Sequence, residues 1–323
     1  MLFFRLTALN TYINPKTHIL CGFLLNLKTG EIMDTKQNIQ WFPGHMTKTK
    51  RQIQASLKLI DVVVEIIDAR IPVSSSNPDL NEMIQSKPKL VLLNKCDKAD
   101  RNATQLWVNY YSQNGITALP VDCKTGKGLN QFVPSVRKIL DKKFKAQQAK
   151  GIKNPILRVM IVGIPNVGKS SFINRVSKQS RAKVEDRPGV TRGNQWYTIS
   201  KDLEMLDTPG VLWPKFDDQK VGENLAFTGA IKDNILDIEL LACDFLKNMQ
   251  KHPTEKFLER FKLTEEDIEN IDSYELLQLI GRKRGMLISG GEINTERAAA
   301  LVLDEYRDGK FGNITLEYPE EIN

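Results

Sequence analysis

The sequence has few of the residues that build metal sites and disulfide frameworks. Its 323 residues include three histidines and four cysteines, and no two cysteines form a CxxC pair. Widely spaced cysteines argue for a reducing compartment and against a zinc site or a disulfide scaffold. No apolar run has the length of a membrane-spanning helix, so we expect no membrane span.

The first 32 residues have no acidic side chain before Glu31, although they contain apolar patches at 2–9 and 19–25. They lack the basic start and the small-residue cleavage site of a signal peptide. They hold one arginine and no serine, which is atypical of a transit peptide. We interpret residues 1–37 as an N-terminal extension of a cytoplasmic protein, either disordered or upstream of a working start at Met33. An organellar presequence in residues 1–32 is the alternative.

The charge balance is basic but not extreme. Lysine and arginine outnumber aspartate and glutamate by 46 to 39, which gives a net charge of +7 and a pI near 9.1. This excess suits a polyanionic partner such as RNA but does not identify one. The apolar and charged fractions, 41% and 26%, are ordinary for a globular protein of one large domain or two smaller ones.

Between residues 58 and 210, short apolar runs alternate with segments of helical spacing. The runs are KLIDVVVEIIDAR, PKLVLLNKCD, GITALPV, LRVMIVG and LEMLDTPG. Such runs predict an α/β fold whose parallel sheet is covered on both faces. From about residue 217 only helical patterns follow, which predicts a smaller all-helical domain. The predicted domains are therefore residues 1–37, 38–216 and 217–323.

A phosphate-binding loop is predicted at residues 163–170, where GIPNVGKS follows a predicted strand and opens a predicted helix. The run fits GxxxxGK[ST], a loop whose backbone N–H groups turn inward around phosphates. We expect Lys169 to reach the β- and γ-phosphates as a catalytic group, and the Ser170 hydroxyl to bind Mg²⁺. The nucleotide-binding residues predicted here are Asn166, Val167, Gly168, Lys169, Ser170 and Ser171.

Two further segments complete the predicted Mg²⁺ site. DTPG at residues 207–210 ends another strand, where Asp207 can hold Mg²⁺ and the Gly210 N–H can sense the γ-phosphate. RPGVTRG supplies Thr191, whose hydroxyl can complete the ligand shell when this loop closes. The predicted Mg²⁺ ligands are Ser170, Thr191 and Asp207.

A guanine reader is predicted at NKCD, residues 94–97, which precedes the phosphate loop. Guanine offers two adjacent donors, N1–H and N2–H₂, which the Asp97 carboxylate can accept, whereas adenine has no such pair. Asn94 can bond the base and brace the phosphate loop, and the stem of Lys95 can cover the ring. Backbone N–H groups of VDCK, after the next strand, can meet the guanine carbonyl, although aspartate replaces the usual serine there. The guanine-binding residues predicted are Asn94, Lys95, Cys96, Asp97, Asp122 and Cys123.

Each motif follows the carboxyl end of a predicted strand, which is the edge where ligands bind in open α/β sheets. Their order is that of a GTPase whose guanine-reading half has moved to the front. Because lateral hydrogen bonds and packing hold a sheet, the pocket survives such a rearrangement. The predicted fold is a circularly permuted P-loop GTPase domain with a mostly parallel sheet, followed by the helical domain. This order places the helical domain directly after the nucleotide-sensing DTPG loop.

The chain lacks the glutamine that many GTPases carry after DxxG to orient the attacking water. Val211 stands at that position and cannot hydrogen-bond a water. Either another group orients the water or intrinsic hydrolysis is slow. His45 is a candidate, because the preceding WFPG can form a stiff turn that presents it. The alternative is a structural or exposed histidine.

The chain resembles the RbgA/YlqF family of circularly permuted GTPases in the order of its motifs: QWFPGHM, DAR, NKCD, GIPNVGKS, PGVTRG, DTPGVLWPKF and LAFTGAIKD. The resemblance covers about residues 39–230 and extends loosely to EYRDGKFGNITLE. That family acts in late assembly of the large ribosomal subunit and has a hydrophobic residue in place of the catalytic glutamine, here Val211. The resemblance implies that His45 assists hydrolysis and that Asn166 lies where related GTPases hold K⁺.

The resemblance also implies a low GTPase rate that the large ribosomal subunit stimulates. It implies that the helical domain, residues 217–323, contacts ribosomal RNA, and that ribosomal proteins are further partners. We expect the protein to be a monomer. Three basic clusters are compatible with RNA contact, although each can also be a solvated face. They are Lys48, Lys50 and Arg51; Lys142, Lys143, Lys145, Lys150 and Lys153; and Arg282, Lys283 and Arg284.

Two functions of another kind stay open at the level of sequence. Val211 permits an RNA-binding scaffold that uses GTP only as a structural ligand. The phosphate and guanine motifs also fit a GTPase that acts on protein partners only. An ATPase is disfavoured, because Asp97 suits the donors of guanine.

Overall fold

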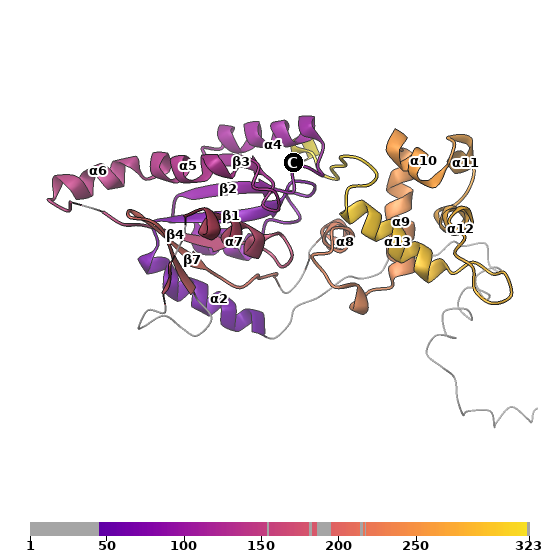
Figure 1. Cartoon of the computed structure of the whole chain (residues 1–323), viewed down its shortest axis with the longest axis horizontal. Coiled ribbons are helices and arrows are strands. Elements are labelled where there is room, and N and C mark those ends of the chain that lie inside the picture. The colour runs from indigo at the N-terminus through magenta and orange to yellow at the C-terminus, as the bar shows by residue number, and fades with distance from the viewer. Residues whose placement is uncertain are drawn as a thin grey trace, which may run out of the picture. The chain divides into compact units, whose positions relative to one another are not determined.

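The computed structural model describes residues 45–153, 155–180, 183–185, 195–213, 216 and 218–321, which all belong to one compact unit that spans residues 38–323. Within these ranges one sheet has seven strands in the order β3-β2-β1-β4-β7-β6-β5 (Figure 1). The strands are β1 (Val62–Asp68), β2 (Lys89–Asn94), β3 (Thr117–Val121), β4 (Leu157–Val162), β5 (Lys183–Glu185), β6 (Gln195–Ser200) and β7 (Leu203–Asp207).

The sheet is mostly parallel, which confirms the predicted fold class. Strands β3, β2, β1, β4 and β7 run parallel, and β6 and β5 extend the sheet antiparallel. Sequence patterning missed β5 and β6. Strand β6 is not a continuous apolar run, because only Trp196 and Ile199 are buried and the residues around them are half-exposed.

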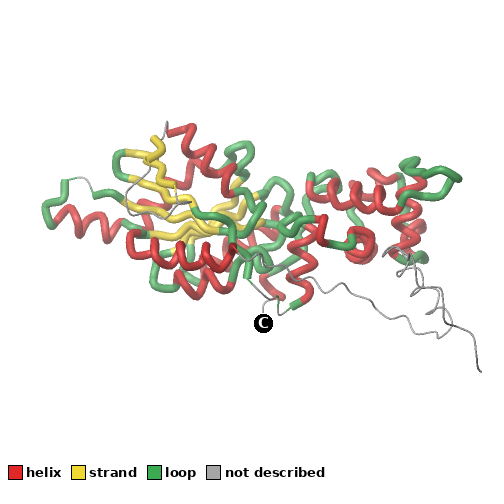
Figure 2. The backbone as a smooth tube through the Cα atoms, turned by 90° about the horizontal axis from the view of Figure 1, so that it is seen from below, coloured by secondary structure: helices red, strands yellow, loops and turns green. Residues whose placement is uncertain are grey.

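Helices cover both faces of the sheet (Figure 2). Successive side chains of β2 point to opposite faces, so Val91 and Leu93 pack with Trp107, whereas Leu90 and Leu92 join the larger core. The helices of this part are α2 (His45–Ser56), α3 (Pro78–Ile84), α4 (Arg101–Gln113), α5 (Phe132–Ile139), α6 (Asp141–Ala149) and α7 (Lys169–Ser180), with 3-10 turns η1 (Leu57–Leu59) and η2 (Leu129–Gln131).

The described residues after 217 form helices and loops, with one isolated bridge between Leu287 and Ile293. The helices are α8 (Gln219–Phe227), α9 (Ile238–Lys251), α10 (Glu255–Phe261), α11 (Glu266–Glu269), α12 (Ser273–Lys283) and α13 (Thr295–Arg307), with 3-10 turns η3 (Asp233–Ile235) and η4 (Pro319–Glu321). None of the helices in the described ranges is long and apolar enough to cross a membrane.

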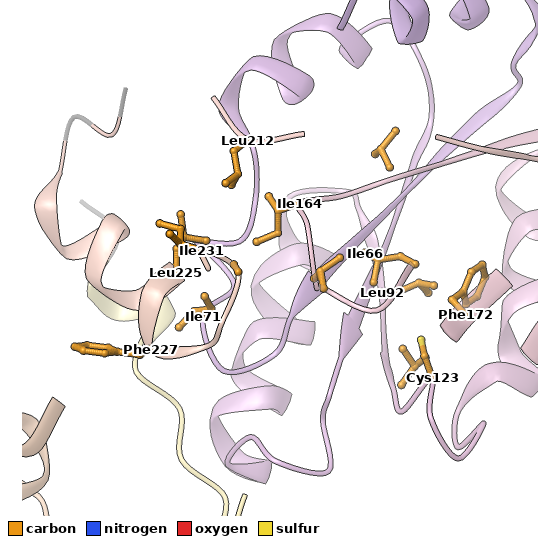
Figure 3. Packing of buried hydrophobic residues seen from close by; sticks show 14 of the residues in the cluster. Ile66, Ile71, Leu92, Cys123, Ile164, Phe172, Leu212, Leu225, Phe227 and Ile231 are labelled. Atoms are coloured by element: carbon orange, nitrogen blue, oxygen red, sulfur yellow. The ribbon is translucent and has the colours of Figure 1, made fainter. Parts of the chain in front are cut away.

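The hydrophobic core is continuous from the sheet into this helical part. Leu225 of α8 and the nearby Ile231 belong to the same buried cluster as Ile66 and Ile164 (Figure 3). Within the helical part, Phe245 of α9 packs on Tyr306 of α13 with ring centroids 4.6 Å apart. The domain boundary at residues 216 and 217 stays a prediction, since packing crosses it.

The chain beyond α13 returns to the strands that precede the phosphate loop and lies near α4 (Figure 1). The Ile314 N–H donates to the carbonyl of Lys98 at 3.0 Å. The Trp107 indole N–H donates to the carbonyl of Glu317 at 2.9 Å. The last segment of the chain is therefore bound to the part of the sheet that carries NKCD.

Candidate nucleotide-binding site

The phosphate loop connects β4 to α7 and needs glycine at two positions. Gly163 has φ +152°, and a Cβ there would lie 2.5 Å from the carbonyl oxygen of Ile66. Gly168 has φ +106°, and a Cβ there would lie 2.2 Å from Nδ2 of Asn94. Larger residues would push neighbouring backbone and side chains apart. The glycines of the motif thus let the loop pack directly on β1 and on NKCD.

Lys169 is the first residue of α7, and its ammonium group is turned back into the loop. Its Nζ donates to the carbonyls of Gly163 at 3.0 Å and Ile164 at 2.8 Å. Burial lowers the pKa of Lys169 to about 8, and the nearby Asp207 carboxylate offsets part of this effect. The cation therefore sits among acceptors at the place where phosphate oxygens bind in loops of this type.

Asp207 ends β7 and lies close enough to Lys169 for the two charges to interact. Burial raises the pKa of Asp207, and Lys169 opposes that rise. Ser170 is exposed at the start of α7, whereas Thr191 lies outside the described residues. An aspartate and a hydroxyl are oxygen ligands of the kind that Mg²⁺ prefers, and Mg²⁺ commonly takes only one or two protein carboxylates besides phosphate oxygens.

The DTPG loop packs against the phosphate loop. A Cβ on Gly210 would lie 2.8 Å from Nζ of Lys169 and 2.9 Å from the backbone nitrogen of Pro165. The Val211 N–H donates to the carbonyl of Gly163 at 3.3 Å, and the Val211 side chain is buried. The valine that replaces glutamine therefore faces the core.

Asn94 ties the phosphate loop to both segments predicted to read guanine, NKCD and VDCK. It ends β2 and is buried. Its Nδ2 donates to the carbonyl of Val167 at 2.7 Å, and its Oδ1 accepts from the Cys123 N–H at 2.9 Å. Its register partners, Asp68 on β1 and Val121 on β3, end their own strands at the same edge. One amide thus joins three loops that lie far apart in the sequence.

Lys95 is held by a residue that the sequence reasoning did not single out. Its Nζ lies 2.9 Å from Oδ2 of Asp68, at the end of β1. Arg70 holds the same carboxylate through Nε at 2.9 Å and Nη2 at 2.8 Å. Burial favours the neutral acid, but Arg70 and Lys95 outweigh it and hold the pKa of Asp68 below its ordinary value. The sequence feature that could have pointed to Asp68 is the position of DAR, residues 68–70, at the end of a predicted strand.

Arg70 also links this charge cluster to the helical part. Its guanidinium lies 5.1 Å from the ring centroid of Tyr306 in α13, a distance at which the cation and the ring attract. The Arg70 carbonyl accepts from the Leu316 N–H at 2.9 Å. The sheet edge that carries NKCD and the helix α13 therefore share a buried arginine.

The VDCK segment forms a hydrogen-bonded turn after β3. The Cys123 N–H is bound to Asn94, and the Lys124 N–H donates to Oδ1 of Asp122 at 2.8 Å. These two N–H groups are therefore hydrogen-bonded within the protein, and a contact of this segment with guanine stays a prediction. Asp122 also accepts from the Thr125 N–H at 3.2 Å, so its side chain shapes the turn. Cys96 is half-buried and Asp97 is exposed.

Helix α2 begins at His45, whereas residues 41–44, predicted to form a stiff turn, lie outside the described residues. The next residue, Met46, is buried, and its Sδ accepts from the Leu212 N–H at 3.4 Å. The start of α2 therefore lies against the segment that follows DTPG.

Asn166 has φ +57° and is exposed. Its Nδ2 donates to the carbonyl of Gly229, in the turn after α8, at 2.9 Å. Arg307 of α13 supports that turn by donating to the carbonyls of Phe227 and Ala226 at 3.1 and 2.9 Å. The phosphate loop thus contacts the helical part through Asn166.

A P-loop, a DxxG loop and an NKxD motif meet at one edge of a mostly parallel sheet, with the guanine-reading strands first in the chain. This combination defines a circularly permuted P-loop GTPase.

Comparison with known proteins identifies the family. Residues 158–277 match the family model described as 50S ribosome-binding GTPase. The chain is 50% identical over 286 residues to ribosome biogenesis GTPase A of Priestia megaterium, which covers 88% of this chain and 98% of that protein. It is 32% identical over 295 residues to mitochondrial ribosome-associated GTPase 1 of Mus musculus, which covers 86% of this chain and 90% of the relative. The chain belongs to the ribosome biogenesis GTPase A family.

The fold agrees with solved structures. A crystal structure of GNP-bound YlqF from T. maritima matches with a TM-score of 0.58 and 29% identity, and covers 85% of this chain and 100% of that one. A GDP-bound structure of TM YlqF matches with a TM-score of 0.59 and 28% identity, over 84% of this chain and 100% of that one. The family match from residue 158 begins at β4, the strand that delivers the phosphate loop.

Proposed function

We propose that this protein hydrolyses GTP to GDP and phosphate as an assembly factor of the large ribosomal subunit. The observation that carries the proposal is Asn94, whose single amide joins the phosphate loop to both guanine-reading segments. It supports one pocket for base and phosphates together. The names of the relatives, ribosome biogenesis GTPase A and mitochondrial ribosome-associated GTPase 1, support the ribosomal partner. The cytoplasm is the proposed location, and a monomer the proposed state.

The chain's own groups supply positioning and charge. The phosphate-loop N–H groups and Lys169 would surround the β- and γ-phosphates, and the Gly210 N–H would meet the γ-phosphate. Mg²⁺, held by Ser170, Asp207 and Thr191, would neutralise charge on the phosphate oxygens. Asp97 would accept the two donors of guanine, with the Lys95 stem fixed beside the ring by Asp68.

His45 is proposed as the group that orients the attacking water. Val211 is buried and has no polar atom in its side chain. The Met46–Leu212 hydrogen bond supports the proposal, because it fixes the residue after His45 beside the residue after Val211. Asn166 is proposed as a K⁺ ligand through Oδ1, since its Nδ2 is bound to Gly229.

Ribosomal RNA is proposed to meet the basic cluster on α6 and on the residues just after it, up to Lys153, which is the most exposed of the three basic clusters. No residue of α6 is buried. A helix this short gains little stability from the helix propensity of its residues alone. Its Lys143 and Lys145 pair with aspartates, but Lys142, Lys150 and Lys153 are exposed and can neutralise phosphates. In contrast, several cations of the other two clusters are engaged within the protein: Lys50 with Asp79, Lys283 with Asp267, and Arg284 with Glu305.

The first experiment measures GTP hydrolysis with and without purified large ribosomal subunits, in K⁺ and in Na⁺ buffer. We expect the subunits to raise the rate many-fold, and we expect His45→Ala to lower the stimulated rate about a hundredfold while GDP affinity stays within about twofold. Tight GTP binding without stimulation would favour a scaffold that uses GTP as a structural ligand. A His45→Ala protein with unchanged rates would remove His45 from the mechanism.

A further inference from the structure

Asn77 is a fully buried amide that belongs to none of the nucleotide-binding motifs. It is the N-cap of α3, where its Oδ1 accepts from the N–H groups of Asp79 at 3.0 Å and Leu80 at 3.3 Å. Its Nδ2 points the other way and donates to the carbonyl of Val211 at 2.8 Å. The oxygen of this amide therefore caps α3, and its nitrogen bonds Val211, the residue that follows DTPG.

The backbone of Val211 is held from both sides. Its N–H donates to the carbonyl of Gly163 in the phosphate loop, and its carbonyl accepts from Asn77. Gly210, the preceding residue, has no side chain to hold it and packs directly on Lys169. The two bonds at Val211 therefore restrain the backbone that follows Gly210, while the Thr208 hydroxyl, which donates to the carbonyl of Ile161 at 2.6 Å, restrains the backbone that precedes it.

Asn77 is itself held from a second side. The loop between β1 and α3 is bound to the end of the chain, where the Val73 N–H and the Ser74 N–H donate to the Glu317 carboxylate at 2.7 and 3.1 Å. This loop is in turn continuous with Asn77. The amide is thus a fixed point rather than a mobile side chain, which is what the orientation of a neighbouring loop requires.

We propose that Asn77 is a positioning residue for GTP recognition and hydrolysis, which holds the backbone after Gly210 so that the Gly210 N–H faces the γ-phosphate. The inference rests on the proposed GTPase function and deepens it. Asn77 bonds the backbone carbonyl of Val211, so its positioning effect does not depend on which side chain stands at position 211. GDP has no γ-phosphate, and its binding does not depend on Asn77.

The test uses two substitutions that keep the helix cap and remove the donor. Asn77→Asp keeps an oxygen that accepts from the α3 N–H groups but offers no N–H to Val211. Asn77→Ser is uncharged and is also a good N-cap, but its side chain is too short to bridge to Val211. Asn294 gives a matched control, because it caps α13 by accepting from the Arg297 N–H at 2.9 Å. The control variants are Asn294→Asp and Asn294→Ser.

The measurements are Kd for GDP, Kd for a non-hydrolysable GTP analogue, and basal kcat and KM, with thermal melting for each variant. We expect both Asn77 variants to bind GDP within about twofold of wild type but to lose at least about fivefold in affinity for the GTP analogue. Basal kcat should fall about tenfold, with KM for GTP raised no more than the analogue Kd. The Asn294 variants should keep both the affinity ratio and kcat.

An unchanged ratio of analogue to GDP affinity together with unchanged kcat would overturn the proposal and leave Asn77 as a helix cap only. Equal losses of GDP and analogue affinity, accompanied by a lower melting temperature, would also overturn it, because the residue would then serve folding. A wild-type protein that binds GTP without hydrolysing it would contradict the proposed function instead. The affinity ratio would still decide the role of Asn77 in that case.

Discussion

At the scale of single residues, Lys169 is a buried cation at the place where the phosphates are proposed to bind. Its ammonium is buried among carbonyls, and its pKa falls from 10.5 to about 8. The unfolded chain therefore binds the Lys169 proton more tightly than the folded protein, so this group makes stability rise with pH between about 8 and 10.5. Phosphate oxygens of a nucleotide would favour the charged form again.

The first prediction follows from that coupling. GDP binding should take up almost no proton at about pH 7, where Lys169 is already charged, and a large fraction of one proton at about pH 8.5. Affinity should fall as pH rises above about 8 for the same reason. Calorimetry in buffers of different ionisation enthalpy measures the uptake. A Lys169→Arg variant serves as control, because guanidinium does not titrate in this range, and equal uptake by wild type at both pH values would refute the prediction.

The residues of the site differ in how far the sequence could reveal them. Asn94, Lys169 and Asp207 stand in motifs whose spacing alone suggests phosphate and guanine contacts. Asp68 stands in DAR, a motif whose spacing suggests no phosphate or guanine contact, and its pairing with Lys95 became visible once β1 and β2 were seen to pair in register, which places Asp68 beside Asn94. The partner of Lys95 is thus decided by strand pairing rather than by local sequence.

At the scale of elements, the parallel strands could be predicted from the sequence, whereas the antiparallel strands β6 and β5 at the edge of the sheet could not. The strand β1 is buried at every position, and a continuous apolar run is a strong signal. Strand β6 is only half-buried, and β5 is three residues long. Such edge strands obtain their structure from the neighbour they pair with, so their own sequence carries little information.

The loop between β1 and α3 joins elements that are distant in sequence. The Glu317 carboxylate accepts from the Ser74 N–H and from Nδ2 of Asn224 in α8, the latter at 2.9 Å. Burial raises the pKa of Glu317. One carboxylate therefore ties together a loop of the sheet, the first helix after DTPG and the end of the chain.

The second prediction concerns this carboxylate. Glu317→Gln places an amide NH₂ opposite donors, so we expect the free energy of unfolding to fall by about 2 kcal/mol. Chemical denaturation measures the change. Glu320→Gln, at an exposed position nearby, should leave the free energy of unfolding unchanged. An unchanged Glu317→Gln protein would show that the carboxylate does not hold these elements together.

At the scale of the whole molecule, the permuted chain leaves the sheet after DTPG, forms helices α8–α13 and then returns. The returning segment contacts Lys98, just after NKCD, and Trp107 of α4. Arg307 and Asn166 form a second bridge at the turn after α8. The predicted division at residues 216 and 217 therefore describes a change of architecture, while contacts join the two sides.

The third prediction tests this dependence with two truncations. Removal of residues 309–323 should weaken GDP binding about tenfold, which corresponds to about 1.4 kcal/mol, and should lower the melting temperature. The reason is that NKCD and the β1–α3 loop lose their contacts with the segment around residues 314–317. Removal of residues 1–37, interpreted from sequence as an extension, should leave GDP affinity unchanged. Fluorescent GDP titration and thermal melting provide the measurements.

The sequence by itself determined the class of this protein: a phosphate loop, a DxxG loop and an NKxD motif, in permuted order on an α/β sheet. These motifs can be recognised in the sequence because each consists of residues that lie only a few positions apart. Only the tertiary structure decided which distant groups support them: Asp68 for Lys95, Asn77 for Val211, and Glu317 for the β1–α3 loop. These contacts arise from strand order and from the return of the chain, which pair residues with no local pattern in common.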